Sequence, residues 1–370
     1  MRFKLILVNL VVLSSLLVVL EVGVRGYWTI RSCVAGSCDF NKLKDIEIVS
    51  GDAFHLNWNR VIRLDETLGF APTEGFSETL DLPGWESAQV SIDLNGLRSH
   101  LGGTGPFDIL TVGDSFTFGD QVSNDETWPF CLELQSGLRV ANAGVPGYGA
   151  AQAVLRAQTF IKDHDVNTVI WSVLLNDDFR RDRLMYRDGL PRPAVIKDGN
   201  IIKWASLPTP DVEGTRFGEK ALSVWAHLLR PFYRYSLLGY AVIKRLPTIG
   251  IRPPDFTGHN MYRLHPKAAS ELEVAAFAMR EFKKLEADKK VIFLQYASYD
   301  FVNETDRLRI KGLRQMIKQY AQELDLRLLD SYVFLEKKLS YFTVEEVWNG
   351  HHTSLGNELM CTFLQSVIRR

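Results

Sequence analysis

The chain has 370 residues, of which 46% are hydrophobic and 24% are charged, and its formal net charge is −1. This length fits one large domain or two ordinary ones, and the composition is that of a folded protein. The balanced charge provides no electrostatic basis for binding nucleic acid, which usually requires a basic domain or face.

An apolar segment opens the chain. Arg2 and Lys4 precede LILVNLVVLSSLLVVL, and the apolar stretch up to Val24 approaches the ~20 residues that a membrane-spanning helix needs. No small-residue cleavage site follows it, so residues 1–26 are interpreted as an uncleaved signal anchor, with a cleaved signal peptide as the alternative. The basic residues in front predict a cytoplasmic N-terminus. The chain is therefore expected to be a single-pass protein of the cell inner membrane, with its main domain in the periplasm.

The four cysteines fit an exported protein. Cys33 and Cys38 lie close enough for a small disulfide loop in an oxidising compartment, and two unpaired thiols beside the membrane are the alternative. Cys131 and Cys361 lie in apolar helical contexts, where plain core residues are expected.

Residues 27–105 are interpreted as a juxtamembrane spacer with an accessory β segment. From residue 106 the chain alternates between apolar strands and amphipathic helices. The expected strands are FDILTVG, LRVANAG, NTVIWSVLL, KVIFLQYAS and LRLLDSYVF, and the expected helices cover residues 127–136, 150–163, 266–288, 306–323 and 354–370. Strands that are apolar almost throughout are typical of a parallel sheet with helices on both faces. The pattern predicts an α/β fold, namely a three-layer α/β/α sandwich around a mostly parallel five-stranded sheet.

An insertion at residues 181–265 separates the third expected strand from the fourth. It contains ALSVWAHLLRPFYRYSLLGYAVIKRL, which is aromatic, apolar and partly basic. This stretch is interpreted as a helical hairpin that covers the domain, or alternatively as a lid or membrane-facing element.

The first expected strand runs directly into Gly-Asp-Ser, which places Ser115 at the carboxyl edge of the sheet, where open α/β folds bind their ligands. In isolation this tripeptide equally fits an ordinary turn that caps a helix. The second strand ends in NAGVPGYG and the third in LLNDDF, so the Gly147 N–H and the Asn176 amide are candidate donors to an oxyanion. WNGHHTSLGN adds two histidines before the last helix. Together these groups predict that Ser115 is a nucleophile.

From residue 107 to the C-terminus the chain resembles the SGNH hydrolase family, also called GDSL-type esterases. GDSFTFG, NAGVPGYG, LLND and NGHHTSLGN resemble the four family blocks, in the family's order. The sequence NGLR at residues 95–98 also resembles membrane-anchored bacterial members.

The resemblance implies that Ser115 is the nucleophile and that its N–H, Gly147 and Asn176 form the oxyanion hole. It implies that His351 is the base, because a glycine follows five residues later as in the family; His352 is the alternative. One departure from the family is Leu174, which stands where a glycine usually precedes the asparagine.

The second departure concerns the acid that usually orients the catalytic histidine, because Asn349 occupies the position of the family's aspartate. An asparagine brings no charge to stabilise an imidazolium. Three interpretations follow: a Ser–His dyad, a substitute acid such as Glu346, Glu345 or Asp330, or loss of catalysis.

The predicted function is that of a serine esterase or O-acyltransferase, without metal or organic cofactor, which acts through an acyl-enzyme on Ser115. The expected substrates are acyl esters, in particular O-acetyl esters, of cell-surface or secreted polysaccharide, with polysaccharide-export machinery as a partner. Hydrolysis of lipid or other carboxylic esters is one alternative. A non-catalytic polysaccharide-binding or assembly protein is the other, and Asn349 favours it.

Overall fold

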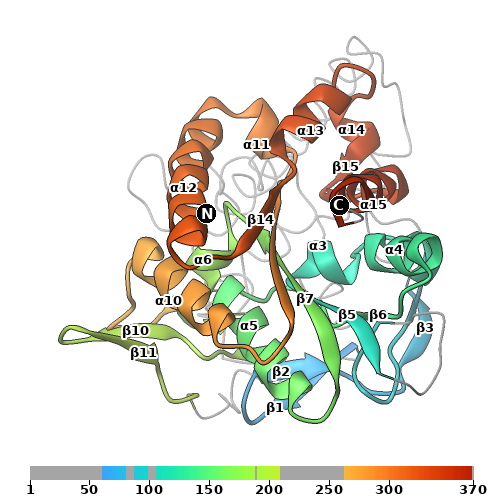
Figure 1. Cartoon of the computed structure of the whole chain (residues 1–370). Coiled ribbons are helices and arrows are strands. Elements are labelled where there is room, and N and C mark those ends of the chain that lie inside the picture. The colour runs from blue at the N-terminus through green and yellow to red at the C-terminus, as the bar shows by residue number, and fades with distance from the viewer. Residues whose placement is uncertain (1–60, 81–86, 99–105, 188–189, 209–261, 369–370) are drawn as a thin grey trace, which may run out of the picture. The chain divides into compact units, whose positions relative to one another are not determined.

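A computed structural model describes residues 61–80, 87–98, 106–187, 190–208 and 262–368, all of which belong to one compact unit. Its centre is a five-stranded sheet in the order β14-β13-β7-β5-β6, in which all neighbouring strands are parallel (Figure 1). The strands are β5 (Phe107–Val112), β6 (Val140–Asn142), β7 (Val166–Leu174), β13 (Lys289–Gln295) and β14 (Arg327–Asp330). The predicted parallel sheet and α/β fold are confirmed.

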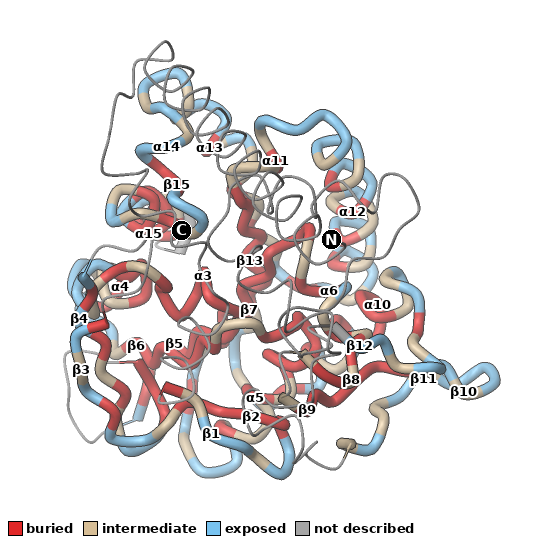
Figure 2. Tube along the Cα trace, turned by 180° about the vertical axis from the view of Figure 1, so that it is seen from behind, coloured by how far each residue is buried: buried red, intermediate tan, exposed pale blue. Residues whose placement is uncertain are grey.

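The central strands are apolar throughout because both faces of the sheet are covered. Trp171 of β7 pairs with Ile292 of β13, so the next residue, Phe293, points to the opposite face. The Trp171 ring packs against Phe282 at 5.0 Å, whereas Phe293 packs against Trp128 at 5.6 Å. Each face of the sheet therefore has its own apolar layer, and Figure 2 shows these strands as largely buried.

Two groups of helices supply these layers. α5 (Ala150–Ile161) and α10 (Glu271–Lys283) pack together on the Trp171 side, and α4 (Trp128–Ser136) and α15 (Ser354–Ile368) pack together on the Phe293 side. Figure 1 shows the sheet between these groups, with α12 (Glu304–Glu323) beside α10 and β14. The shorter helices are α3 (Ser115–Phe118), α6 (Asp178–Arg181), α11 (Tyr299–Val302), α13 (Tyr332–Lys338) and α14 (Val344–Val347).

Numbered along the chain, the strands of this sheet lie in the order 2-1-3-4-5. The chain thus leaves β5 in one direction for β6 and then returns to the other side for β7. In open sheets of this kind ligands bind beyond the carboxyl ends of the strands, at the point where the direction reverses. This point lies between β5, which precedes Ser115, and β7, which precedes Asn176.

The last expected strand was too long. β14 ends at Asp330, and α13 begins at Tyr332, so the apolar run that continues to Phe334 belongs to a helix. The Asp330 side chain accepts a hydrogen bond from the Tyr332 N–H, and the Ser331 hydroxyl donates to the Leu294 carbonyl. These bonds turn the backbone out of the sheet, and the apolar pattern alone cannot reveal them.

Small antiparallel elements surround the sheet. They are the hairpin of β1 (Ile62–Asp65) and β2 (Gly69–Pro72), the hairpin of β3 (Ser77–Leu80) and β4 (Ala88–Ser91), the sheet of β12 (Tyr262–Leu264), β8 (Leu184–Arg187) and β9 (Leu190–Pro191), and the hairpin of β10 (Val195–Asp198) and β11 (Ile201–Trp204). The described part of the predicted insertion is thus mainly β structure.

Several sequence predictions lie outside the described residues. They are the signal anchor, the Cys33/Cys38 loop and the aromatic stretch of the insertion. Within the described ranges, no helix has the length and apolar character needed to cross a membrane.

Cys131 and Cys361 form a disulfide, which corrects the expectation that they are plain core residues. Cys131 lies on α4 and Cys361 on α15, and the two helices pack side by side. The two cysteines are 230 residues apart in sequence, so only the packing of the helices brings them together.

Replacing both bridged cysteines by alanine is expected to lower the free energy of unfolding by about 2–5 kcal/mol, because the unfolded chain would lose a long covalent loop. Thermal unfolding of the full-length protein, with and without dithiothreitol, tests this expectation. The reductant should lower the melting temperature of the wild type and have a much smaller effect on the double variant. Equal melting temperatures for the oxidised wild type and the variant would refute a stabilising role.

Candidate active site

Ser115 lies at the carboxyl end of β5 and is the first residue of the short helix α3. Asp114 caps this helix, since its carboxylate accepts a hydrogen bond from the Phe116 N–H at 2.9 Å. Ser115 is 4% exposed. As the first helical residue its N–H has no acceptor within the helix, and it remains available to another group.

The NAGVPGYG block, residues 142–149, packs directly on this helix. A Cβ atom built on Gly144 would lie 2.3 Å from the Phe118 nitrogen, so only glycine permits this approach of the two backbones. The block thereby holds the end of β6 against α3, at the same edge of the sheet as Ser115.

The two histidines lie on a tight hairpin of β15 (Trp348–Asn349) and β16 (His351–His352), which turns at Gly350 with φ of +80°. The His351 Nε2 atom lies 2.9 Å from the Ser115 Oγ atom. The backbone N–H of His351 donates to the Gln121 Oε1 atom at 3.0 Å, which fixes the hairpin against the segment after α3. A nucleophile and a base within hydrogen-bond reach are the minimum requirement for serine catalysis.

His352 lies away from Ser115, in apolar packing. It is 2% exposed, and its ring lies 4.8 Å from the Phe116 ring and 5.8 Å from the Trp348 ring. Neither ring nitrogen has a hydrogen-bond partner among the described residues. Burial lowers the pKa of His352 to about 3, an effect that His351 reinforces and the Tyr296 carbonyl opposes. Of the two candidate bases, the structure thus brings His351, not His352, to Ser115.

In the described ranges, no acid bonds to the side of the His351 ring that meets the acid in a serine triad. Its Nδ1 atom is buried and has no hydrogen-bond partner among the described residues. Asn349 is exposed and pairs with His351 across the hairpin. The Glu346 carboxylate accepts from the Thr343 N–H and caps α14, and Asp330 binds Arg314 and Tyr296. Glu345 is exposed. None of the proposed substitute acids therefore orients the ring through Nδ1.

A carboxylate that the sequence analysis did not consider lies at the other ring nitrogen. The Asp120 Oδ2 atom is 3.7 Å from His351 Nε2. Asp120 lies two residues after α3, in the GDQ that follows GDSFTF. In the sequence Asp120 belongs to a second Gly-Asp pair, but it is so far from His351 along the chain that nothing indicated a contact between them.

The two further oxyanion donors proposed from sequence differ in their surroundings. Gly147 adopts φ of +80°, and its carbonyl accepts hydrogen bonds from Arg192 at 2.8 Å and from Arg187 at 3.3 Å. The Asn176 Nδ2 atom donates to Asp300 and to Asp306, at 3.1 Å each.

The amide atom of Asn176 that faces Asp300 and Asp306 must be the nitrogen Nδ2 and not the oxygen, because a carboxylate accepts hydrogen bonds but cannot donate them. The two carboxylates occupy both hydrogens of the amide, and the Asn176 Oδ1 atom is buried without a partner among the described residues. In this conformation Asn176 is bound to acids of α11 and α12, and its role at an oxyanion stays a prediction.

Arginines lie near the Ser115–His351 pair, and Arg181 forms ion pairs with Asp114, Asp177 and Asp178. Arg181 donates to Asp114 at 2.7 Å and to Asp178 at 2.8 Å, directly behind Ser115. Burial, and then the charges of Arg181 and Arg187, lower the pKa of His351 to about 3. Since 26% of the His351 side chain is exposed, water screens part of this effect. The direction means that His351 is neutral near pH 7, which is the state a general base needs.

Arg98, in the NGLR sequence, holds the segment that carries Asp120. Its guanidinium donates to the carbonyls of Gly119 and Val122 at 2.6 Å each, and to that of Phe118 at 3.1 Å. Burial lowers the pKa of Arg98 to about 10, so that it still carries its charge near pH 7. The sequence showed this arginine only as part of a resemblance, because these three acceptors lie 20 or more residues away.

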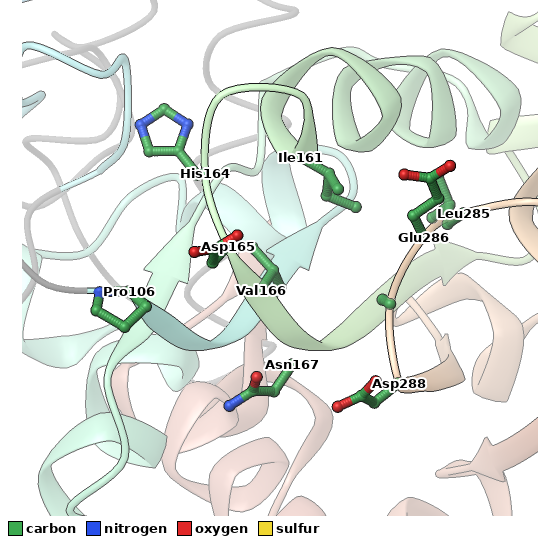
Figure 3. Close-up of a pocket in the computed structure, with 10 residues that line it drawn as sticks. Pro106, Ile161, His164, Asp165, Val166, Asn167, Leu285, Glu286 and Asp288 are labelled. Atoms are coloured by element: carbon green, nitrogen blue, oxygen red, sulfur yellow. The ribbon is translucent and has the colours of Figure 1, made fainter.

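A hollow of about 700 Å³ lies at the opposite edge of the sheet (Figure 3). It is lined by residues that precede or begin the strands, among them Pro106, Val166 and Asp288. It therefore does not include the Ser115–His351 pair. In the described part of the chain, no group of three or more His, Cys, Asp or Glu side chains could hold a metal ion.

No family model matches the sequence, and no curated protein matches it. The structure is similar to a member of the lipolytic G-D-S-L family from Veillonella parvula, with 14% identity and a TM-score of 0.37 over 71% of this chain and 98% of that one. It is similar to the α/β hydrolase LAE5 from the Lake Arreo metagenome, with 10% identity and a TM-score of 0.40 over 71% and 95%. It is also similar to the acetylxylan esterase Axe2 of Geobacillus stearothermophilus, with 11% identity and a TM-score of 0.38 over 72% and 95%.

Proposed function

We propose that this chain is a serine-dependent ester hydrolase or O-acyltransferase. The observation that carries the proposal is the 2.9 Å contact between Ser115 Oγ and His351 Nε2, beyond the carboxyl end of β5. That place is where this strand order positions ligands. A neutral histidine that is hydrogen-bonded to a serine at the first turn of a helix can take the proton of the serine hydroxyl.

The chemistry is acyl transfer in two steps. His351 Nε2 takes the Ser115 hydroxyl proton while Oγ bonds to the ester carbonyl carbon, and the carbonyl π electrons move to its oxygen. The intermediate then collapses: the bond to the alcohol oxygen breaks, and that oxygen receives the proton from Nε2. Water or an acceptor hydroxyl attacks the acyl-serine through the same proton relay, which releases Ser115 and yields an acid or a new ester.

The oxyanion of each intermediate needs two or more donors. The Ser115 N–H, at the start of α3, and the Gly147 N–H supply them, and the positive charges around Gly147 favour the anion. Asn176 becomes a third donor when its amide leaves Asp300 or Asp306. Removing one such donor typically costs on the order of 10²–10³ in rate.

The substrates we propose are O-acyl esters, in particular O-acetyl esters, of cell-surface or secreted polysaccharide. The predicted signal anchor supports this choice because it would place the domain in the periplasm, next to the cell inner membrane and to polysaccharide-export machinery. A disulfide between Cys131 and Cys361 is typical of such an oxidising compartment. Lipid and other carboxylic esters are the alternative substrates.

A second candidate function is a non-catalytic polysaccharide-binding or assembly protein with the same fold. The Nδ1 atom of His351 favours it, because no acid in the described part of the chain bonds to that atom as in a serine triad. A binding protein requires no reactive serine, so reactivity of Ser115 separates the two functions.

A fluorophosphonate probe on the full-length protein tests the proposal. We expect stoichiometric labelling at Ser115, located by peptide mass spectrometry, together with hydrolysis of p-nitrophenyl acetate above the background rate. A second arm adds an acetyl donor and an oligosaccharide acceptor, and acetylated acceptor in the product would identify a transferase. An unlabelled Ser115 and background hydrolysis would support the binding protein instead.

A further inference from the structure

Asp120 is a buried carboxylate whose hydrogen-bonding capacity is not fully used. The residue is 3% exposed, and its Oδ1 atom is buried without a hydrogen-bond partner among the described residues. Burying an unsatisfied carboxyl oxygen is costly, so a residue of this kind usually has a functional reason. Its other oxygen, Oδ2, lies 3.7 Å from His351 Nε2.

The position of Asp120 is fixed from two sides. Arg98 binds the carbonyls of Gly119 and Val122, which flank it in the chain. The next residue, Gln121, has φ of +74° and accepts the backbone N–H of His351. One segment therefore holds both the histidine hairpin and the carboxylate beside the reactive nitrogen.

We propose that Asp120 is the positioning acid of this site, and that its carboxylate stabilises the imidazolium of His351 from the Nε2 side. The inference rests on the proposed function. When Ser115 transfers its proton, the new N–H of His351 forms at the nitrogen nearest to Asp120. An opposite charge within 4–6 Å favours the protonated ring. Asp120 thus replaces in part the charge that Asn349 does not supply.

The charged groups that face Asp120 come from several elements. Arg98 lies after β4, Asp114 precedes α3, Arg181 is in α6, Arg187 is in β8 and His351 is in β16. Burial raises the pKa of Asp120 well above its usual range, an effect that Asp114 reinforces and the three arginines oppose.

The raised pKa of Asp120 predicts how the activity changes with pH. The carboxylate charge is present above that pKa and is lost as the pH falls through it, whereas His351 stays unprotonated to lower pH. The acidic limb of the pH–rate profile therefore belongs to Asp120, and replacing Asp120 should move this limb to lower pH.

The test compares the full-length wild type, Asp120→Asn and Glu133→Gln. Glu133 is a matched control, because it is also 3% exposed but lies on α4. We expect Asp120→Asn to lower kcat/KM for p-nitrophenyl acetate about 10²-fold and to shift the acidic limb down by one pH unit or more. Glu133→Gln should keep both within twofold and 0.3 pH units, roughly the uncertainty of the assay.

A second readout does not depend on catalysis. The wild type and Asp120→Asn, labelled with ¹³C-histidine, are titrated by NMR, and His351 is assigned from the signal missing in His351→Gln. We expect the His351 ring signals of the wild type to shift as the Asp120 carboxyl titrates, and this step to be absent in Asp120→Asn. If Asp120→Asn does not fold, Asp120→Ser takes its place, with the same expectations.

Different results would refute the proposed function and the role proposed for Asp120. An unlabelled and inactive wild type refutes the proposed function, while the NMR titration still tests the contact between Asp120 and His351. Identical titrations overturn the inference, whatever the activity. A loss of activity in Asp120→Asn with an unchanged acidic limb also overturns it, since a merely structural defect would have that result.

Discussion

Replacing Ser115 by alanine is expected to abolish covalent labelling by a fluorophosphonate and to lower kcat for p-nitrophenyl acetate by about 10³–10⁵-fold. The alanine removes the Ser115 hydroxyl, whose oxygen lies 2.9 Å from His351 Nε2. Losing the serine of a complete triad costs about 10⁶-fold. A smaller loss is expected here because no acid of the described residues bonds to His351 Nδ1, so the starting rate is lower.

The fold should tolerate this substitution. The Ser115 hydroxyl meets His351 and, more weakly, Asp114 at 3.4 Å, and neither contact lies in the apolar core. A melting temperature within a few degrees of the wild type is therefore the control. If Ser115→Ala is folded and hydrolyses the ester as fast as the wild type, the activity belongs to another site and the serine mechanism is wrong.

The sheet could be predicted because its signals are local. FDILTV and NTVIWSVLL are apolar runs of strand length, and each ends in polar residues at a sheet edge. α4 begins at Trp128 and α12 at Glu304, within two residues of the predicted starts, because capping residues and apolar periodicity act over one or two turns. Ser115 and His351 could be predicted for the same reason, since each lies in a short polar segment next to an apolar element.

What the sequence did not reveal depends on contacts between distant segments. The bridge from Cys131 to Cys361 forms because α4 and α15 pack on one face of the sheet. The amide of Asn176 meets Asp300 and Asp306 only after β7 and β13 have paired. Such contacts depend on the placement of whole elements, and no single-sequence spacing encodes them.

The contact between Asp120 and His351 is another contact between distant segments that could not be predicted from the sequence. A search for an acid along the chain near His351 leads to Glu345 and Glu346, which lie five or six residues before it. The folded chain instead brings a carboxylate from the segment after Ser115 to the other ring nitrogen. Although Asn349 is uncharged, a carboxylate therefore lies next to the His351 ring.

The two adjacent histidines provide the second large prediction. His351→Ala is expected to lower kcat by about 10³–10⁵-fold, because proton removal from Ser115 then has no base at 2.9 Å. His352→Phe should lower it less than about tenfold, a value well below the loss of a general base. The His352 ring is buried against Phe116 and Trp348, and an apolar ring preserves that packing.

Stopped assays of both variants over pH 5–8, with the melting temperature as a control, check this difference. Because burial lowers the pKa of His352 to about 3, that ring is neutral across this range, and phenylalanine removes two buried ring nitrogens that have no hydrogen-bond partner among the described residues. The His352→Phe variant is therefore expected to be at least as stable as the wild type. If His352→Phe were inactive and His351→Ala active, the base would be His352, and the hairpin would have to turn by one residue to bring it to Ser115.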